Sequence, residues 1–508
     1  MSKWKLAIQT LIVMLGAFMA ILDTTIVDIV VPKMIAPLKT DLYGIQWVIT
    51  SYMIAAAVAL PLLEWLSKAI GLKPVYILGV ALFTLASYLC GISTELAQMI
   101  IFRSIQGFAE ALIMVAAQAI LFSIYPPEQK GVAMGIFGLG ASFAPAIGPT
   151  LGGWLTEHFS WNWVFFINVP VGVVLVFLSL IFLEEVEKEK RLLPFNFLSF
   201  FFISVATIST LVVLSKGQQL GWFTSNFIAF LTAIAVISYL LYFLTEAFSK
   251  NKLVELSVFK NLNFTVAFLT FLLVLGFSMY QLFYAIPLYF EQLKGLSTLQ
   301  TGLLMLPFAL AIAFFSVVAG ALSDKWSAEK TLILAIFIYF LGIYAIRNTD
   351  YYTPKELFAK ELLIVGTGMG LFFAPVTVIA LRGLENKTIL VISLLDYIRF
   401  IGGSFGTAIA TNILKGRTNF HYDEISALQS LNYDFVLQKI QNISNFFEAT
   451  SSTKQEALIK AGYAVGTLQY KVAYSFAFQD LFVWAGIFSL IGIIPVVAYF
   501  IAQRLKAV

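Results

Sequence analysis

The chain has 508 residues, of which 60% are hydrophobic and only 12% carry a charged side chain. Its mean hydropathy is +0.89 and its net charge at pH 7 is +4. A composition this apolar excludes a water-soluble globular protein, and so small a positive charge gives no support for nucleic-acid binding. We therefore expect a protein with many membrane-spanning segments.

Fourteen apolar runs, each long enough for a membrane-spanning helix of about 20 residues, follow one another along the chain. A closed β-barrel would instead show alternating strands of about ten residues. The first run, residues 8–31, is too long for the apolar part of a secretory signal and lacks an Ala-x-Ala cleavage site, so we expect it to remain as a helix. The predicted fold class is an all-α integral membrane protein. The runs centre on Leu15, Ala55, Leu82, Leu112, Phe143, Val173, Ile208, Ala235, Leu273, Ile312, Ile338, Leu371, Phe405 and Leu490.

Basic residues in the short loops indicate the orientation. Lysine and arginine are more numerous in the loops that share a side with the N-terminus, and an even number of helices brings the C-terminus to that side. We therefore expect both termini in the cytoplasm. The lone cysteine, Cys90, cannot form an intrachain disulfide, and His158 and His421 are far apart in sequence, so no metal or other cofactor is expected. No nucleophile and base are arranged as in an enzyme.

Two short segments predict an internal duplication. Residues 65–74 (WLSKAIGLKP) lie between the second and third helices, residues 321–330 (ALSDKWSAEK) lie between the tenth and eleventh, and both carry a Leu-Ser pair at the helix exit. Weak similarity between distant halves is typical of duplicated transporter folds. We expect an N-terminal six-helix bundle over residues 1–186, two linker helices over residues 187–255, and a C-terminal six-helix bundle over residues 256–508.

Two polar stretches interrupt the apolar pattern. Residues 184–191 (EEVEKEKR) alternate in charge, which is typical of a solvated linker. Residues 415–476 are rich in Asn, Gln and Ser and should project outward between the last two helices. This outer segment could be a docking hairpin or a loosely ordered loop, with a helix over Phe435 to Phe447.

The fifth run contains the segment GASFAPAIGPTLGG, residues 140–153. Pro145 and Pro149 lack a backbone N–H and can bend the helix. Gly148, Gly152 and Gly153 allow a neighbouring backbone to approach closely. The segment therefore predicts either a hinge or a tightly packed seal.

Together with four other segments, this stretch resembles the fourteen-helix drug:proton antiporters of the major facilitator superfamily, the EmrB/QacA-like family, and within it the EmrB type. The resemblance implies two six-helix bundles plus two linker helices, and export of lipophilic or amphipathic drugs and toxic compounds in exchange for protons. The other four segments are Leu22 to Pro32 (LDTTIVDIVVP), Arg103-x-x-Gln106-Gly107, Tyr125 to Lys130 (YPPEQK) and Trp163 to Pro170 (WVFFINVP).

The cytoplasmic loop motif of this family usually begins with Gly and contains an Asp. The second copy here keeps both, as Gly320 and Asp324, whereas the first has Glu64 and Lys68 in their places. Glu64 and Lys68 stand at i and i+4 on a helix and can pair, a contact worth about 0.2–0.5 kcal/mol where it is exposed. We therefore expect a weakened or rewired contact in the N-terminal copy.

Six ionisable side chains fall within the predicted helices, where each costs roughly 2.5–3.5 kcal/mol unless it is paired or hydrated. Asp28 stands where the family commonly has Asn, and Glu110 stands where a small apolar residue is usual. Intramembrane charges of this kind are functional candidates. The candidates for proton coupling are Asp23, Asp28, Arg103, Glu110, Asp396 and Arg399.

The depths of these charges can be predicted from about 1.5 Å of rise per residue on antiparallel helices, which puts Asp23 level with Glu110 and Asp28 near Arg103. The resemblance implies that the first and fourth helices line the central cavity. Burial favours a protonated carboxyl and a nearby arginine favours the ionised form, so a change of exposure loads and releases a proton. We expect Asp23 to carry the proton, Arg103 to modulate it and Glu110 to be a second carrier. The alternative is a buried pair that only holds two helices together.

Asp396 and Arg399 stand at i and i+3 in the thirteenth helix, which predicts an intrahelical ion pair, with Asp396 as a further proton site by analogy. Gly402, Gly403 and Gly406 follow and predict close helix packing.

Five aromatic residues on the ninth and twelfth helices are candidates for the substrate cavity, because the resemblance implies that these helices line it. Aromatic walls suit flat or lipophilic molecules, and an acid nearby suits cations. Each ring could instead face lipid. The five are Phe277, Tyr280, Tyr284, Phe372 and Phe373.

The expected function is proton-coupled export, and the alternative is a proton-independent facilitator or an exporter of one metabolite. The embedded acids favour antiport, and the sequence has no phosphate-binding loop, so the proton-motive force is the expected energy source. The resemblance also implies a bacterial inner membrane and, for EmrB-like members, a periplasmic membrane-fusion adaptor with an outer-membrane channel such as TolC. QacA-like members work alone. The outer segment would be the docking surface.

Overall fold

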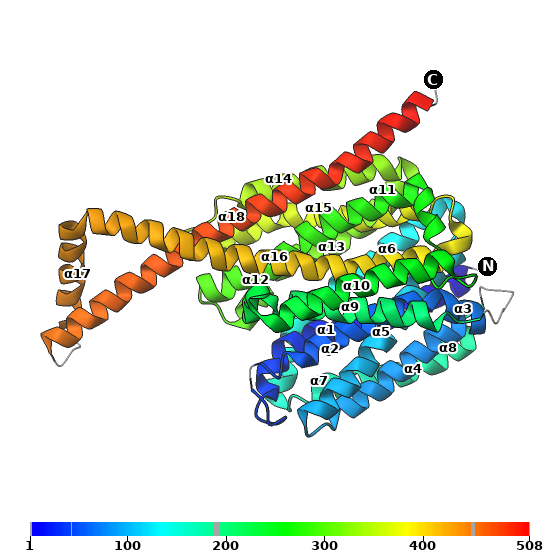
Figure 1. Ribbon diagram of the computed structural model, residues 1–508, viewed down its shortest axis with the longest axis horizontal. Helices are drawn as coiled ribbons and strands as arrows, with labels where there is room; N and C mark the ends of the chain where they lie inside the picture. Colours follow the sequence, from blue (N-terminus) through cyan, green and yellow to red (C-terminus); the bar gives the residue numbers. More distant parts are fainter. Residues whose placement is uncertain (1–2, 42, 186–193, 449–452, 507–508) are drawn as a thin grey trace.

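The computed structural model describes residues 3–41, 43–185, 194–448 and 453–506, and its helices form two bundles joined by a hairpin, with an arm that projects from one side (Figure 1). Both termini lie opposite the arm, so we call the two sides the terminus side and the arm side. The N bundle consists of α1 (Lys3–Val30), α2 (Trp47–Ala59) continued by α3 (Leu63–Ile70), α4 (Leu72–Gly91), α5 (Leu96–Ile124), α6 (Lys130–His158), and α7 (Trp163–Phe166) followed by α8 (Asn168–Phe182).

The linker hairpin and the C bundle follow in chain order. In the C bundle one membrane span is divided into α-helical and π-helical parts. The linker hairpin is α9 (Phe197–Leu220) and α10 (Asn226–Phe248). The C bundle consists of α11 (Leu262–Thr270), the π-helix η6 (Phe271–Met279), α12 (Tyr280–Leu288), the π-helix η7 (Tyr289–Leu293), α13 (Thr298–Lys325), α14 (Ala328–Ile346), α15 (Lys355–Leu381), α16 (Thr388–Leu431), α17 (Tyr433–Glu448) and α18 (Lys454–Lys506).

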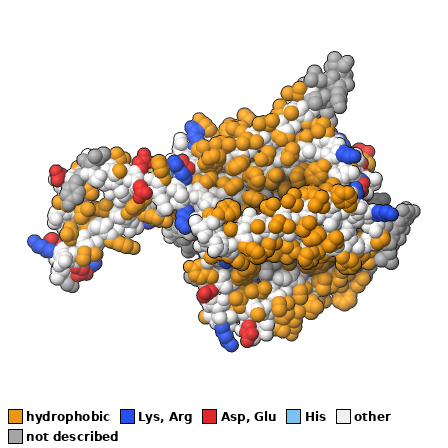
Figure 2. Space-filling view, in the orientation of Figure 1, with side chains coloured by type: hydrophobic (Ala, Val, Ile, Leu, Met, Phe, Trp, Pro, Cys, Tyr) orange, Lys and Arg blue, Asp and Glu red, His pale blue; other side chains and the backbone are white. Residues whose placement is uncertain are grey.

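The predicted helical spans are confirmed, because every one of the fourteen predicted centres lies in a helix. Within the described residues, thirteen spans are long and apolar enough to cross a membrane. The remaining predicted span is α6, which runs without a break for 29 residues, through both of its prolines. In Figure 2 the sides of the bundles form a broad apolar belt, and the charged side chains gather at its two ends and on the arm.

Local sequence signals explain where several helices begin and end. The side chains of Asn261, Ser297 and Ser327 accept hydrogen bonds from the first backbone N–H groups of α11, α13 and α14, which would otherwise lack partners. Ser297 also forms a capping box with Gln300. Gly221 ends α9 in the left-handed conformation, with φ 77°, which glycine adopts without strain.

The outer segment is helical, so the alternative of a loosely ordered loop was wrong. α16 and α18 continue past the bundle without interruption, and α17 closes the end of the arm that they form (Figure 1). The helix predicted over Phe435 to Phe447 is confirmed by α17. The polar composition of the segment reflects exposure to water rather than irregular structure. Hydrogen bonds from Arg417 and His421 to Asp480, at 2.5 and 2.8 Å, join α16 to α18 at the base of the arm.

Only Glu184 and Glu185 of the charged stretch at 184–191 are described; both are exposed, as predicted for a solvated linker, and both also make contacts. Glu184 pairs with Lys5 at 3.1 Å. Glu185 accepts hydrogen bonds from the backbone N–H groups of Leu72 and Lys73 at the start of α4. Residues 186–191 of the stretch lie outside the described residues.

Candidate functional site

Asp23 and Arg103 form a buried ion pair inside the N bundle. The Arg103 guanidinium donates to the Asp23 carboxylate at 2.6 Å, and both side chains are at most 1% exposed. Gln106 and Asn168 donate to the other Asp23 oxygen at 3.0 and 2.7 Å. The guanidinium also lies over the ring of Tyr52, 4.1 Å from its centre. Both oxygens of the Asp23 carboxylate thus accept hydrogen bonds from donors on α5 and α8.

The spacing Arg-x-x-Gln-Gly explains how α5 builds this network. Arg103 and Gln106 are three residues apart and therefore lie on one face of the helix. Gly107 lies against the backbone of Tyr52, where a Cβ would overlap the carbonyl oxygen, so glycine lets α2 approach α5 closely. The Arg103 Nε donates to the Val48 carbonyl across that contact, at 3.2 Å.

The predicted depths were wrong for Asp23, which lies level with Arg103 and not with Glu110. The prediction assumed straight helices perpendicular to the membrane, and tilted helices shift the register, here by the seven residues, about two turns, that separate Arg103 from Glu110. The exposed side chain of Asp28 lies further toward the arm side on α1. The closed, fully paired network around Asp23 agrees with the structural alternative for this pair, whereas its role in proton transfer stays a prediction.

Glu110 differs from Asp23, because it is buried without a full set of partners. The residue is 5% exposed, and its Oε2 atom has no hydrogen-bond partner among the described residues. The hydroxyl of Tyr52, the nearest polar neighbour on α2, also lacks a partner with acceptable geometry. Arg399 of the C bundle is the charged group that acts most strongly on Glu110, followed by Asp396. Glu110 therefore faces the opposite bundle.

Asp396 and Arg399 form the predicted intrahelical pair, with 3.3 Å between the Asp396 oxygen and the Arg399 Nε. A hydrogen bond crosses the bundle interface at this level, from the Gln118 amide on α5 to the other Asp396 oxygen at 3.1 Å. The side chain of Tyr280 interacts electrostatically with Arg399, Glu110 and Asp396. We call Tyr52, Glu110, Gln118, Tyr280, Asp396 and Arg399 the central cluster.

Sequence analysis missed Tyr52, Gln118 and Asn168. Tyr52 and Gln118 are common residue types on apolar helices and carry no local signal of their own. Asn168 does lie in the segment WVFFINVP that supports the resemblance, so its position was marked although its role was not. The predicted close packing of Gly402, Gly403 and Gly406 is confirmed, because a Cβ at each would press on Leu272, the Tyr280 ring or Gly276.

The glycines of the segment at 140–153 pack α6 against α1. A Cβ on Gly148 would overlap Thr25, and one on Gly152 would lie 3.1 Å from Ile26. The prediction was wrong for Gly153, which has no atom within 4 Å of where a Cβ would lie. The side chains of Pro145 and Pro149 lie outside the described residues. The segment is thus a close helix contact within the N bundle.

The second copy of the loop motif closes the terminus side of the interface between the bundles. Asp324, at the end of α13, accepts hydrogen bonds from the backbone N–H groups of Gly131 and Val132 at 2.7 and 2.9 Å. These are the first free donors of α6, where the helix dipole favours a negative charge. Gly320 lies directly against the backbone of Gly131, and a Cβ on either would overlap the other. We call this contact the α6–α13 seam.

The first copy forms a different contact, which we call the α3–α16 seam. Glu64 and Lys68 make the predicted i,i+4 pair, at 2.6 Å. With Glu385, Lys387 and the first residues of α16 they line a polar pocket of about 210 Å³. Lys387 is itself paired with Glu255 at 2.6 Å and holds the pKa of that carboxyl below its usual range. Among the described residues, no acid reaches the start of α16 as Asp324 reaches α6.

The aromatic candidates for the substrate cavity separate into two groups. Tyr280 belongs to the central cluster and Tyr284 is half-buried on the same helix. Phe372 is fully buried between helices of the C bundle and contacts Phe271 and Phe373, and its assignment to the cavity stays a prediction.

Phe277 is half-buried, and its ring packs edge-on against Phe405 of α16 and Phe488 of α18, at 6.0 and 5.5 Å between ring centres. Phe373 is half-buried beside Phe372. The assignment of Phe277 and Phe373 to the substrate cavity stays a prediction.

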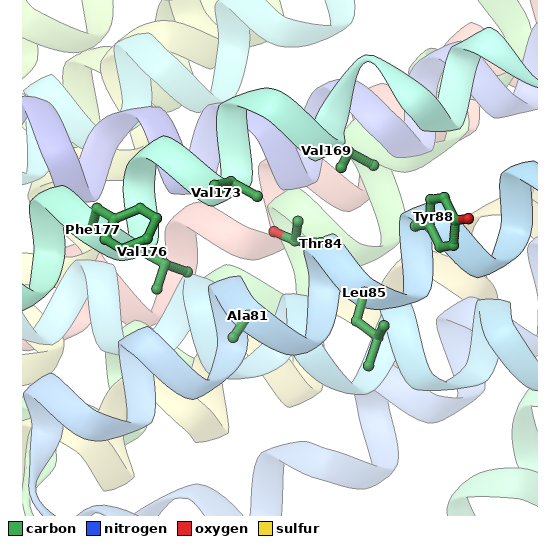
Figure 3. A pocket seen from close by; sticks show the side chains of 8 residues that line it. All are labelled: Ala81, Thr84, Leu85, Tyr88, Val169, Val173, Val176 and Phe177. Carbon is green, nitrogen blue, oxygen red and sulfur yellow. The ribbon is translucent and has the colours of Figure 1, made fainter.

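A groove of about 380 Å³ lies between α4 and α8, as Figure 3 shows. Its lining is apolar apart from the tip of Tyr88 and the hydroxyl of Thr84, and the Thr84 hydroxyl already donates to the Val80 carbonyl at 2.6 Å. Leu85 and Phe177 at its edges are exposed on the outside of the bundle. The groove lies on the outside of the bundle, and no Asp, Glu, Lys, Arg or His lines it.

Comparison with known proteins agrees with this architecture. The family description "Major Facilitator Superfamily" matches residues 13–407. The chain belongs to this superfamily. Its members are transporters and not enzymes, so the protein is a multi-pass membrane transporter. The chain is 30% identical over 432 residues to the multidrug export protein EmrB of Escherichia coli strain K12, covering 83% of each chain. It is 31% identical over 423 residues to the fatty acid resistance protein FarB of Neisseria gonorrhoeae, covering 82% of each.

Solved structures support the major facilitator fold. The human organic anion transporter MFSD10 aligns with a TM-score of 0.59 over 95% of this chain and 99% of its own, at 14% identity. The proton:xylose symporter XylE aligns with a TM-score of 0.56 over 92% and 95%, at 12% identity. These likenesses concern the fold alone.

Proposed function

We propose that the protein is a proton-coupled antiporter that exports lipophilic or amphipathic drugs and toxic compounds by alternating access. Membership of the major facilitator superfamily and the similarity to EmrB and FarB support export of such compounds. In this proposal the protein lies in a bacterial inner membrane with both termini in the cytoplasm, and the proton-motive force is its only energy source.

One observation supports Glu110 as the main proton carrier: its carboxylate is buried at the bundle interface with one oxygen unpartnered. Burial disfavours the charged form of a carboxyl in general, and a positive charge such as that of Arg399 across the interface favours it. Movement of the bundles changes the distance between these two groups. Glu110 can therefore bind a proton when it is far from Arg399 and release it when the two approach. Asp23 lacks this freedom, because three donors hold its carboxylate within the N bundle.

The test compares Glu110→Gln with Asp23→Asn in proteoliposomes. Glu110→Gln should abolish proton-driven export of a fluorescent dye, at least a hundredfold, while exchange of labelled dye continues, because the amide cannot carry a proton. Asp23→Asn should instead destabilise the protein, since breaking a buried pair costs about 3–5 kcal/mol. The measurements are dye flux, proton uptake and thermal unfolding.

Two results would redirect this assignment. Wild-type coupling in Glu110→Gln would remove Glu110 from the mechanism. A stable but uncoupled Asp23→Asn would transfer the role to Asp23. Clear dye flux in the wild type with no pH change would favour the alternative, a proton-independent facilitator or an exporter of one metabolite.

We further propose that the arm docks a periplasmic adaptor of the membrane-fusion type, which would connect to an outer-membrane channel. Support comes from the exposed apolar side chains on the arm, among them Phe446 and Tyr463, each 78% exposed (Figure 2). Exposed apolar side chains of this size are typical of surfaces that bind a partner, and an arm in contact with water alone would not require them. Replacing Phe435, Phe446, Ile459 and Tyr463 by Ser should reduce capture of the adaptor at least tenfold without altering the unfolding of the bundles. Undiminished capture would contradict the proposal.

A further inference from the structure

The linker hairpin does more than connect the two bundles, because α9 is bonded to both of them. It packs against α2 of the N bundle and α16 of the C bundle, and Ala57, Leu211 and Ile401 form a small buried cluster where the three helices meet. α9 therefore covers the line along which the bundles separate on that side.

The polar contacts of the hairpin with α16 are widely spaced, and the pair nearest the middle of the helices is partly buried. The hydroxyls of Thr207 and Tyr397 are 2.7 Å apart, and Tyr239 of α10 adds a third hydroxyl, 3.1 Å from that of Tyr397. Trp222, just after α9, donates to Asn412 of α16 at 2.9 Å. Tyr397 and Asn412 are 15 residues apart, which is about 22 Å along the helix. Bonds at two such distant levels hold the hairpin in a fixed orientation on the C bundle.

The polar contacts of α9 with α2 are different in kind. They are confined to one level at the arm-side end, where Ser215 lies 3.3 Å from Thr50 and the Lys216 ammonium donates to the Gln46 amide oxygen at 2.7 Å. The first contact is long for two hydroxyls, and the second joins a buried ammonium to a neutral amide instead of a carboxylate. The Lys216 ammonium also contacts the Gln219 amide oxygen of its own helix, at 3.4 Å, so it keeps a partner when its bond to Gln46 breaks. The contacts with α2 also lie at the end of the helices, where rocking of the bundles produces the largest displacement.

We propose that α9 is a sliding seal: it remains fixed to the C bundle and keeps the gap between α2 and α16 closed, while its contacts with α2 form and break during transport. The inference rests on the proposed alternating access. Sealing one side matters to a transporter of lipophilic compounds, because an open gap there would connect the central cluster with the bilayer.

The test uses reversible cross-links in a Cys90→Ser background. One double variant, Thr50→Cys with Ser215→Cys, joins α9 to α2, and the other, Thr207→Cys with Tyr397→Cys, joins α9 to α16. After reaction with a short bifunctional methanethiosulfonate, the first should lose dye export at least tenfold and recover on reduction. The second should keep export within about twofold of its own uncross-linked rate. The single-cysteine variants treated with the same reagent are the controls. The opposite pattern, or undiminished export with both cross-links, would overturn the seal.

A second measurement does not depend on transport. Spin labels at exposed positions report the distance from Ile208 on α9 to Leu341 on α14, and from Ile208 to Leu78 on α4. The first distance should be single and constant between pH 5 and pH 8, and the second should show two populations. A variable first distance, or a single fixed value for both, would contradict the seal. If no variant exports dye even without a cross-link, the proposed function fails. The spin-label distances then test by themselves whether α9 stays fixed to the C bundle.

Discussion

The α6–α13 and α3–α16 seams occupy corresponding places in the two halves but are built differently. In the α6–α13 seam Asp324 caps α6, and two glycines bring the helix backbones into contact. In the α3–α16 seam Lys68 takes the place of the acid and Glu64 that of the glycine, so the two side chains pair with each other. A polar pocket remains beside the start of α16.

The difference shows how few residues decide whether a helix start becomes a contact between the bundles. An acid can reach free N–H groups and gain from the helix dipole, whereas a lysine is repelled by the same dipole. A glycine permits contact between backbones, whereas a glutamate occupies the space. We therefore expect the α6–α13 seam to provide most of the free energy that holds the two bundles together on the terminus side.

Gly320→Ala should have the largest effect on this comparison. The added methyl group would overlap the backbone of Gly131, and overpacking of this kind costs about 1–3 kcal/mol. The seam should open, which alkylation of Ser316→Cys, a buried position on the same seam, measures in a Cys90→Ser background. Gly416→Ala is the control, because no atom lies within 4 Å of its added methyl group. Equal alkylation of both variants would show that the glycine contact does not hold the seam.

Asp324→Ala should have the next largest effect. Loss of the cap and its charge costs about 1–2 kcal/mol, which lowers the ratio of closed to open seam about five- to thirtyfold. Asp324→Asn should lie between this variant and the wild type, because it keeps an acceptor but loses the charge. The same alkylation assay tests this order. If Asp324→Ala left the alkylation of Ser316→Cys unchanged, packing alone would account for the closed seam.

Glu64→Gly combined with Lys68→Asp should have the smallest effect and the opposite sign. The double variant gives the α3–α16 seam the residues of the other seam, so a carboxylate can cap α16 and the unfolding temperature should rise by a few degrees. Lys68→Ala is the control: it removes the ammonium without supplying a new cap, and because the Glu64 side chain is only 10% exposed, it should lower the unfolding temperature and not raise it. A fall in the unfolding temperature of the double variant would mean that the pocket is too wide for the new acid to reach the helix.

The sequence predicted the fold well because its main signal, long apolar runs, depends on length and hydropathy alone. Interactions along one helix were also predictable, as the pairs Glu64–Lys68 and Asp396–Arg399 show. Contacts between helices were less so. The error in the depth of Asp23 arose from helix tilt, which tertiary packing decides.

Polar partners without a motif could not be predicted. Gln118 and Tyr52 lie on helices whose other residues are apolar, and only the structure brings them to Glu110 and Asp396. For a related reason the sequence left the arm open between a docking hairpin and a loosely ordered loop. The polar composition of the arm is that of an exposed helical hairpin as well as that of a loop, and only the continuity of α16 and α18 with the bundle distinguishes the two.

That continuity has a mechanical consequence. α16 has 44 residues and α18 has 53, which correspond to about 66 and 80 Å of uninterrupted helix. Each is anchored in the C bundle and protrudes beyond it, so the arm behaves as a stiff lever whose pivot lies inside the membrane. A small rotation of that bundle swings the tip by several times the displacement at the bilayer surface. A partner bound at the tip of the arm would therefore be displaced in every transport cycle.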